Sequence, residues 1–426
     1  MKDSGVKWIE QIPEDWSLIR FKDKYINRKE IAGKNSTDYE RLALTLNGVI
    51  KRPKDDSEGL QPKEFDCYQI IYENDFVFKM IDLQNISTSR VGLSPYTGLV
   101  SPAYIRFSPR IEGQYNKFVY YFLMSMYYNC VYNNLAGNGV RSALNATDMG
   151  QFVIPYPSIN IQRKIVNLLE NKLTQMDNLI ANQQAQIEKL KEYKQSVITE
   201  AVTKGLDSTA PMKDSGVEWI GKIKISNNVY RLKFALKSPL LYGANESGDV
   251  HYQAVRYIRI TDITNDNQLK DDDNNQYLTE QQAQGYILSH NDVLFARSGG
   301  TVGKTFIFNE KYGRCAFAGY LIKAECNKNI LLPKFLMYYT QSSLYDIWRS
   351  MIFIQSTIQN IGANKYANLE IILPPIREQV AVVDYLDKKC ANIDNLISIK
   401  QQKIEKLQEY KKSLIYEYVT GKKEVV

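Results

Sequence analysis

The stretch IEKLKEYKQSVITEAVT at residues 187–203 recurs as IEKLQEYKKSLIYEYVT at residues 404–420, an offset of 217 positions. Twelve of the seventeen residues are identical, and apolar residues recur in both copies at alternating steps of three and four. This heptad spacing is typical of long helices that pack against another helix. The chain therefore contains an internal duplication whose best-preserved part is a coiled-coil helix.

The rest of the chain repeats in the same order. KDSGVKWI at residues 2–9 returns as KDSGVEWI at residues 213–220. Fainter matches at offset 217 link Asn74 and Asp75 with Asn291 and Asp292, Phe78 with Phe295, and Lys117 and Phe118 with Lys334 and Phe335. The order is a globular part, a helix, a linker, a second globular part and a second helix.

The repeat predicts the domain boundaries, and the length of 426 residues suits two or three domains. We expect a globular domain at 1–157, a helix at 158–205, a linker at 206–211, a second globular domain at 212–374 and a second helix at 375–422. Gly205 is well placed to cap the first helix, and Pro211 prevents its continuation. Proline-containing strand ends at 154–157 and 373–375 precede the two helices.

The heptad positions define the predicted helix cores, and eight of the ten positions in each copy are apolar. The apolar positions used for this prediction are Leu169, Leu173, Met176, Ile180, Ile187, Leu190, Val197 and Ala201 in the first helix and Leu386, Cys390, Ile393, Ile397, Ile404, Leu407, Leu414 and Tyr418 in the second. Polar residues interrupt both cores at equivalent places, Gln183 with Lys400 and Lys194 with Lys411. Such breaks can fix the register, accept another subunit or lie near solvent.

Composition excludes several classes of protein. Charged residues make up 24% of the chain and hydrophobic residues 44%, which excludes a disordered or collagen-like protein. The five cysteines form no C-x-x-C pair and only two histidines are present, so a disulfide framework, a zinc ribbon and a His-dependent enzyme are excluded. No signal peptide is visible, and the apolar segment 118–132 is short for a membrane span, so we expect a buried helix there and a cytoplasmic protein.

Two motifs resemble catalytic signatures but lack essential residues. Residues 298–305 (SGGTVGKT) approach the phosphate-binding loop G-x-x-x-x-G-K-[ST], yet Ser298 stands where the first glycine belongs and a strand is expected after the loop. A glycine-rich turn that presents Arg297, Ser298 and Lys304 to a phosphate or a base is the better interpretation, with a plain hairpin as the alternative. At residues 373–376, LPPI lacks the Asn or Asp with which amino-methyltransferases hold the target amine.

Several basic and amide side chains are candidates for DNA contact, because Arg reads guanine, Asn and Gln read adenine, and Lys and Arg contact phosphates. Residues 257–261 (YIRIT) predict a strand with one polar face, with Arg256 and Arg259 reaching outward. An ordinary solvated surface is the alternative for each candidate. The candidates are Lys51, Arg52, Lys54, Lys79, Arg90 and Arg141 in the first globular part, and Arg256, Arg259, Arg297, Ser298, Lys304, Gln355 and Asn360 in the second.

These segments together resemble the specificity subunit of type I restriction-modification enzymes. The resemblance rests on residues 2–16 (KDSGVKWIEQIPEDW), 213–223 (KDSGVEWIGKI), 291–305 (NDVLFARSGGTVGKT) and 356–379 (STIQNIGANKYANLEIILPPIREQ), and on the two heptad helices. It covers essentially the whole chain. The first globular part departs from it, with FKMI at residues 78–81 in place of the glycine-rich F-A-R-S-G run.

The resemblance implies a fold of two mixed α/β target recognition domains, joined by two long antiparallel coiled-coil helices with pseudo-two-fold symmetry. It implies that each domain reads one half of a split DNA site and that the helices set the spacer. It also implies a non-catalytic subunit that binds double-stranded DNA, two modification subunits, docked along residues 161–203 and 378–420, and restriction subunits. S-adenosylmethionine, ATP and Mg would then belong to these partners, with no cofactor or metal on this chain.

Two other classes of function remain open on the residues alone. One is an enzyme that acts by itself on DNA, either a methyltransferase or an NTPase. The other is a coiled-coil interaction protein with no role on DNA. The net charge of +7 is compatible with polyanion binding but does not require it.

Overall fold

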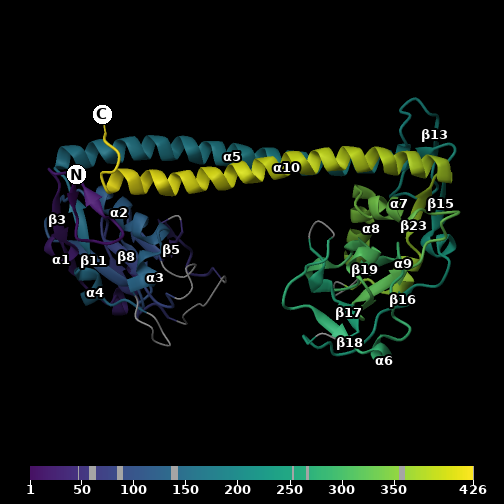
Figure 1. The fold of residues 1–426 in the computed structure, drawn as a ribbon, viewed down its shortest axis with the longest axis horizontal. Coiled ribbons are helices and arrows are strands. Elements are labelled where there is room, and N and C mark those ends of the chain that lie inside the picture. Colours follow the sequence, from purple (N-terminus) through teal and green to yellow (C-terminus); the bar gives the residue numbers. More distant parts are fainter. Residues whose placement is uncertain are drawn as a thin grey trace. The chain divides into compact units, whose positions relative to one another are not determined.

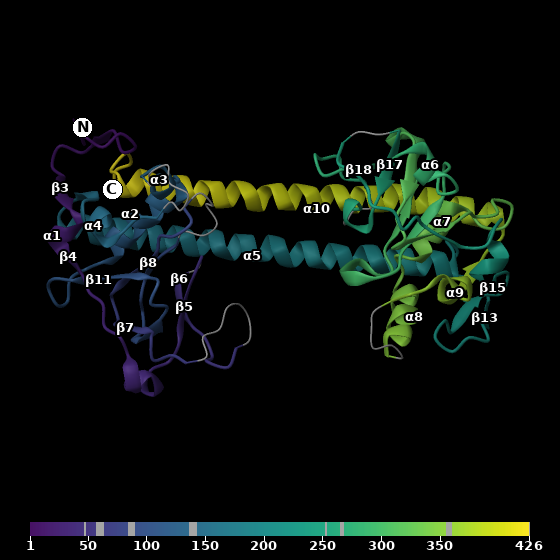
Figure 2. The same cartoon turned by 90° about the horizontal axis from the view of Figure 1, so that it is seen from below.

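A computed structural model describes residues 1–46, 48–56, 64–83, 90–135, 143–251, 254–264, 268–354 and 360–425. The chain forms two compact units, each built from a globular body and part of both long helices. Unit 1 comprises Met1–Gln183 with Gln402–Val426, and unit 2 comprises Gln184–Gln401. Both bodies mix helices and strands (Figures 1 and 2), as the sequence predicts.

The body of unit 1 contains a four-stranded antiparallel sheet in the order β4-β11-β8-β9, and Phe21, Phe76, Phe78 and Phe107 meet mostly edge to face in the core. Smaller two-stranded sheets surround it. The elements are β1 (Lys2–Asp3), β2 (Gln11–Ile12), β3 (Ser17–Arg20), α1 (Phe21–Lys24), β4 (Tyr25–Asn27), β5 (Leu42–Thr45), β6 (Gly48–Lys51), β7 (Gln69–Ile71), β8 (Phe76–Lys79), β9 (Arg90–Leu93), β10 (Gly98–Val100), β11 (Ile105–Pro109), α2 (Lys117–Tyr128), α3 (Val131–Leu135), α4 (Ala146–Gly150) and β12 (Val153–Tyr156).

The body of unit 2 repeats this plan with an antiparallel sheet in the order β16-β22-β19-β20. A second sheet, β18-β17-β21, includes one parallel pair. The elements are β13 (Met212–Asp214), β14 (Lys222–Lys224), β15 (Asn228–Arg231), β16 (Leu241–Tyr242), β17 (Val255–Ile258), β18 (Gln276–Leu278), α6 (Glu280–Ala283), β19 (Val293–Ala296), β20 (Thr305–Ile307), β21 (Cys315–Phe317), β22 (Leu321–Ala324), α7 (Pro333–Tyr339), α8 (Ser343–Ile354), α9 (Ala363–Ala367) and β23 (Glu370–Leu373).

The repeated sequence motifs form the same local structures in both units. Asn74 and Asn291 adopt left-handed backbone angles, with φ of 68° and 74°, in the tight turns that lead into β8 and β19. Asparagine tolerates this conformation because its short polar side chain can bond locally. The buried carboxylates of Asp75 and Asp292 each accept a backbone N–H three residues earlier, at 2.8 Å in both cases.

Each repeated aspartate also pairs with a cation on the neighbouring strand, at matching positions of β11 and β22. Asp75 Oδ2 lies 2.6 Å from Arg106 Nε, and both side chains are almost fully buried. Asp292 Oδ2 lies 3.5 Å from Lys323 Nζ, a longer contact to a more exposed cation. Burial raises the pKa of Asp292 above its ordinary value.

Two long helices, α5 (Ile159–Lys204) and α10 (Ile376–Val419), contribute to both units, and within each unit segments of the two lie side by side (Figure 1). All twenty heptad positions are buried or half-buried, which confirms the predicted core. In unit 1, Lys411 forms an ion pair with Asp177, and in unit 2, Lys194 pairs with Asp394 at 2.7 Å. Within unit 2, Gln186 contacts Lys400 and Lys194 contacts Asp394, so residue numbers fall on one helix as they rise on the other and the segments run antiparallel.

The polar breaks in the helix cores are therefore hydrogen-bonded or ion-paired positions. Lys194 and Lys411 are related by the 217-residue repeat, and so are their partners Asp394 and Asp177. Lys400 Nζ donates to Gln186 Oε1 on the other helix. A role of these residues in fixing the register stays a hypothesis.

Two expectations about local structure need correction. The strand predicted over residues 257–261 ends at Ile258, because the chain turns into a 3-10 helix at Ile260–Asp262. The helix expected over residues 118–132 is divided into α2 and α3, because Cys130 takes a left-handed φ of 55°. Gly205, with φ of +76°, ends α5 as predicted.

Candidate nucleic-acid interface

In unit 2 the fold brings together two loops, each of which contains residues that the sequence analysis gave as candidates for DNA contact. The turn after β19 carries Arg297 and Ser298, and the segment before α9 carries Asn360. Ser298 forms a β-bridge with Asn360, and Ile361 N donates to Arg297 O at 2.8 Å. Three candidate residues, which come from two distant segments of the sequence, thus lie together in unit 2.

Arg297 is held by an aromatic ring. Its guanidinium carbon lies 4.9 Å from the ring centroid of Tyr242, and its Nη1 is 3.4 Å from the carbonyl oxygen of Gly319. Arg297 Nε and Asn360 Oδ1 are buried without a hydrogen-bond partner. Buried polar atoms usually have a hydrogen-bond partner, and two that have none within the protein lie in this cluster.

A cavity of about 640 Å³ opens beside this cluster. Its base is apolar, with Ala244 and Ala318, and Tyr320 stands at the cavity with 63% of its surface exposed. The side chains of Asn245 and Arg259 supply polar groups. An exposed tyrosine next to arginine and amide groups is suited to contact with bases and sugars.

Arg256 and Arg259 do not both point outward as the sequence suggested. The Arg256 side chain is only 14% exposed, and its Nη2 donates to Lys270 O and to Asn275 Oδ1. Arg259 lines the cavity but forms an ion pair with Asp262 at 2.8 Å. For Arg259 the error arose because the chain leaves the strand after Ile258, and for Arg256 because a segment distant in sequence supplies its acceptors.

The glycine-rich turn is not a phosphate-binding loop of the NTPase type. Residues Gly299–Thr301 form one 3-10 turn, and the strand β20 follows at Thr305. The turn is thus followed by a strand and not by the helix whose N-terminus binds phosphate in such loops, in agreement with the sequence-based interpretation. Lys304 is half-buried at the end of the turn.

Unit 1 uses the equivalent pair of segments differently. Leu144 N donates to Met80 O at 3.1 Å, matching the bond from Ile361 to Arg297 at offset 217. Met80 is buried in the core of unit 1, whereas Arg297 is half-buried beside the cavity. Lys79 and Arg90 lie opposite each other across β8 and β9. The candidates Arg141 and Gln355 lie outside the described residues.

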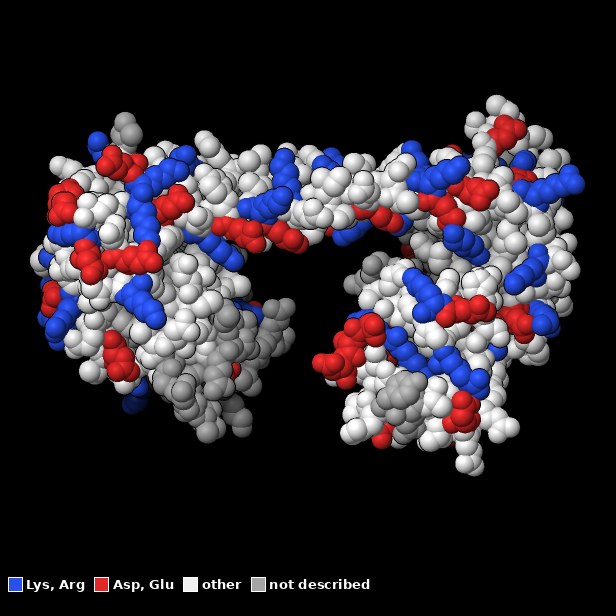
Figure 3. Space-filling view, viewed as in Figure 1, with Lys and Arg blue, Asp and Glu red and all other residues white. Residues whose placement is uncertain are grey.

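The predicted basic turn of unit 1 is partly neutralised by its neighbours. Lys51 pairs with Glu40, Arg52 pairs with Asp56, and Lys54 Nζ donates to Ser36 O at 2.7 Å. The turn lines a cavity of about 520 Å³. In the face drawn in Figure 3, Lys and Arg alternate with Asp and Glu in both units.

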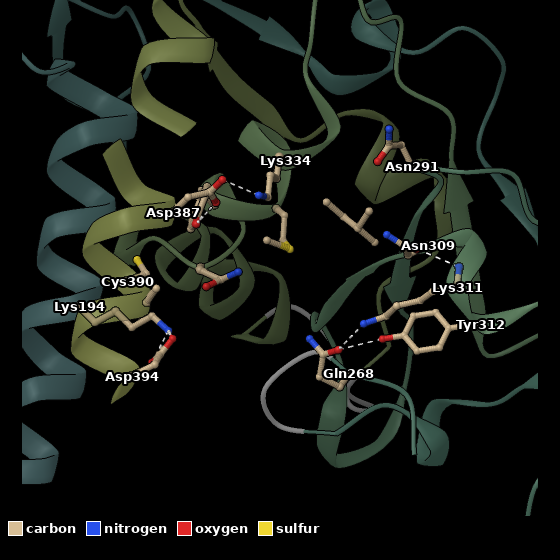
Figure 4. A pocket seen from close by; sticks show the side chains of 15 residues that line it. Lys194, Gln268, Asn291, Asn309, Lys311, Tyr312, Lys334, Asp387, Cys390 and Asp394 are labelled. Atoms are coloured by element: carbon tan, nitrogen blue, oxygen red, sulfur yellow. Dashed lines mark hydrogen bonds and ion pairs between the residues drawn. The ribbon is translucent and has the colours of Figure 1, made fainter. Parts of the chain in front are cut away.

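Sequence reasoning missed a polar pocket of about 580 Å³ in unit 2, shown in Figure 4. Lys194 and Lys334 pair there with Asp394 and Asp387, and Lys311 Nζ lies 3.4 Å from Gln268 Oε1. These lysines already have acceptors, so the pocket is a weaker phosphate site than its lysine content suggests.

The sequence analysis also missed a repeated apolar surface on the helices. In unit 1, Leu179 on α5 and Tyr410 on α10 are exposed, and in unit 2, Leu396 on α10 and Tyr193 on α5 are exposed. Leu396 and Tyr410 stand 217 positions after Leu179 and Tyr193. The same search at offset 217 could have found these pairs, because they flank the heptad core.

Metal-binding clusters and reactive thiols are two kinds of catalytic group that the described residues allow to be checked. No group of three or more His, Cys, Asp or Glu side chains among them could hold a metal ion. All five cysteines are free, and burial raises the pKa of Cys315 to about 11 and that of Cys326 to about 12, so both thiols stay protonated at neutral pH. Across the described parts of the chain, no helix has the length and apolar character needed to cross a membrane.

The family model and the relatives that match this chain all belong to one protein family. The model of the type I restriction modification DNA specificity domain matches residues 17–192 and 243–409. The MjaVIII specificity subunit of Methanocaldococcus jannaschii is 23% identical over 97% of this chain and 94% of its own length. The EcoBI specificity subunit of Escherichia coli is 24% identical over 67% of this chain and 61% of its own length.

A solved structure supports the fold. A chain from a study of complex assembly and conformational transition of the type I R-M system aligns with a TM-score of 0.71 at 15% identity, covering 96% of this chain and 98% of that one. The two matches to the family model correspond to the two halves of the duplication. The chain belongs to the type I restriction-modification DNA specificity family.

Proposed function

We propose that each unit of this specificity subunit reads one half of a split double-stranded DNA site, while the paired helices set the spacer and carry the partner subunits. The observation that carries the proposal is a loop pair that both units build with the same hydrogen bond but with different side chains. Unit 2 has Arg297, Ser298 and Asn360 there, and unit 1 has Met80, Ile81 and Ala143. Equivalent positions with different chemistry suit two different half-sites.

The candidate contacts divide into two kinds. The polar cluster of Arg297, Ser298 and Asn360 would read base edges, since its arginine and amide match the donors and acceptors of the major groove. The basic side chains of unit 1, Lys51, Arg52, Lys54, Lys79, Arg90 and Arg141, and those of unit 2, Arg259 and Lys304, would position the duplex, and Gln355 stays a further candidate. Contacts to phosphates supply most affinity and make binding depend on salt.

The partner subunits would dock on the repeated apolar surface of the helices. The exposed pairs Leu179 with Tyr410 and Leu396 with Tyr193 are related by the repeat, so two copies of the same partner find the same residues. Aromatic side chains are frequent at the energetic centre of interfaces. Two modification subunits fit this duplication, with restriction subunits joining the assembly.

Catalysis would belong to the partners. S-adenosylmethionine, ATP and Mg would bind to modification and restriction subunits, with the present chain working in the cytoplasm as a non-catalytic reader. An enzyme acting alone is the competing function. Purified chain incubated with DNA and labelled S-adenosylmethionine, or with ATP, should show no turnover until partner subunits are added, and turnover by the chain alone would refute the proposal.

Arg297→Ala tests the assignment of the reading surface. In a complex with modification subunits, adenine methylation of a library with both half-sites randomised should lose selectivity only at the half-site of unit 2. Equal damage to both half-sites, or no change at either, would show that the surface is assigned wrongly. Ser226→Ala, at an exposed position of unit 2 away from the cluster, is the matched control.

A further inference from the structure

We infer that Tyr242 is a positioning residue that holds the Arg297 guanidinium to read a guanine in the half-site of unit 2. This inference rests on the proposed reading function of the unit 2 cluster. It adds a residue that the sequence did not nominate, 55 positions away along the chain from the arginine that it supports. It also assigns a base to the half-site.

The ring of Tyr242 is itself fixed in place. Tyr242 lies on β16 opposite Ile322 of β22, and its hydroxyl accepts the backbone N–H of Ala363 at 2.8 Å. The ring thus bridges the edge of the sheet and the start of α9. Tyr242 nevertheless keeps 41% of its surface exposed, so the ring and the guanidinium over it remain near solvent.

Arg297 differs from the other arginines of this region in its charge partners. Arg256 lies 3.9 Å from Asp271, and Arg259 lies 2.8 Å from Asp262. Arg349 forms a close ion pair with Asp346. Among the described residues, Arg297 has no ion pair. A half-buried guanidinium without a carboxylate is suited to a ligand that brings its own acceptors.

The remaining hydrogen-bonding capacity of Arg297 points to a base edge. Nε is buried, and Nη1 uses one N–H on Gly319 O, so the outward N–H groups belong to the two Nη atoms. Two parallel N–H groups at the end of a planar side chain match O6 and N7 of guanine.

The contact between Arg297 and the Tyr242 ring also favours a base over a phosphate as the ligand. Bidentate pairing with guanine requires a fixed plane, which the Tyr242 ring supplies by holding the guanidinium at 4.9 Å. A phosphate accepts a cation from many directions, so a lysine would serve it as well. Replacing Arg297 by lysine therefore separates the two kinds of ligand.

The test uses the full chain in complex with modification subunits and measures adenine methylation of a library randomised in the unit 2 half-site. Arg297→Lys should lose preference for G over the other bases at one position by roughly 5- to 100-fold. Tyr242→Leu should lose several-fold preference at that same position. Tyr242→Phe should keep most of it, because the ring stays on β16 although its hydrogen bond with Ala363 is lost. Tyr230→Leu, another exposed tyrosine of unit 2, is the control.

The outcomes separate this inference from the proposed function. If Arg297→Lys changes selectivity in the unit 2 half-site and Tyr242→Leu does not, the positioning role is wrong and the reading function stands. A position that prefers a base other than G refutes the guanine assignment. No change with either variant refutes the reading surface itself. Should Tyr242→Leu fail a thermal unfolding check, Tyr242→His replaces it and should retain part of the preference.

Discussion

Units 1 and 2 have the same strand order and the same repeated ion pairs, but they differ in the residues of a loop that follows one of the strands. The sheets β4-β11-β8-β9 and β16-β22-β19-β20 have the same strand order, and their aspartates, turns and helix ion pairs recur at offset 217. The loop after the third strand of this order buries Met80 in unit 1 and presents Arg297 in unit 2. Duplication has thus kept the residues that hold the fold and changed those that can meet a ligand.

The buried ion pairs also differ between the units. Arg106 is 3% exposed and bonds to Asp75, to Glu30 and to Ile70 O, whereas Lys323 makes one longer contact with Asp292. Removing one partner of a buried pair leaves an uncompensated charge. The two units should therefore respond unequally to the same kind of substitution.

Arg106→Met should give the largest effect, a loss of about 3–5 kcal/mol in the stability of unit 1, because Asp75 would remain buried and unpaired. Lys323→Met should cost unit 2 about 1–2 kcal/mol. Hydrogen exchange of backbone amides, read separately in each unit, measures both losses. Equal losses would mean that the two pairs are energetically alike despite their geometry.

The pH dependence of the Lys323→Met effect sharpens the same comparison. Burial raises the pKa of Asp292, so folding favours its protonated form, and the stability from this group is lost as the pH rises through the folded pKa. Without Lys323 that pKa should rise further. The cost of Lys323→Met should therefore shrink at acidic pH, and a pH-independent cost would contradict this account.

Met80→Ala and Arg297→Ala test whether the same loop position serves core packing in unit 1 and base reading in unit 2. Met80 is 1% exposed, so its truncation should cost about 2–4 kcal/mol of stability in unit 1. Arg297→Ala should instead cost about 1–3 kcal/mol of base discrimination while stability changes little. Hydrogen exchange measures the loss of stability and the methylation profile measures the loss of base discrimination. If Arg297→Ala destabilised unit 2 as strongly as Met80→Ala destabilises unit 1, the proposed difference between the two positions would be wrong.

The helix ion pairs should give the smallest effects, and equal ones. Lys194 and Lys411 are only partly buried and their aspartate partners are exposed, so Lys194→Met and Lys411→Met should each cost about 0–1 kcal/mol. Thermal unfolding of each variant measures the change. A clear difference between them would show that the repeat does not extend to the energetics of the helices.

Much of the fold was predictable because repetition and periodicity are properties of the chain itself. Heptad positions such as Leu169 and Leu386 are buried as expected, and Gly205 ends α5. The break between α2 and α3 was not predictable, because Cys130 takes a left-handed angle that its residue type does not favour. Similarly, the end of β17 at Ile258 was not predictable, because the alternation of apolar residues continues past it and predicts a longer strand.

The candidate site was only partly predictable. Arg297, Ser298 and Asn360 were nominated from residue type, and they do meet through a β-bridge. The partners that occupy Arg256 could not be found from residue type, because Asn275 lies on a segment whose approach depends on the fold. Tyr242 was missed for the same reason.

The amino-acid sequence alone determined the duplication, the two heptad helices and the positions where the halves diverge, because these are relations between residue types at fixed spacing. The tertiary structure decided which polar side chains have partners inside the protein and which remain available. That distinction depends on distances between residues far apart in the chain, such as Arg297 and Tyr242, which spacing along the sequence cannot supply.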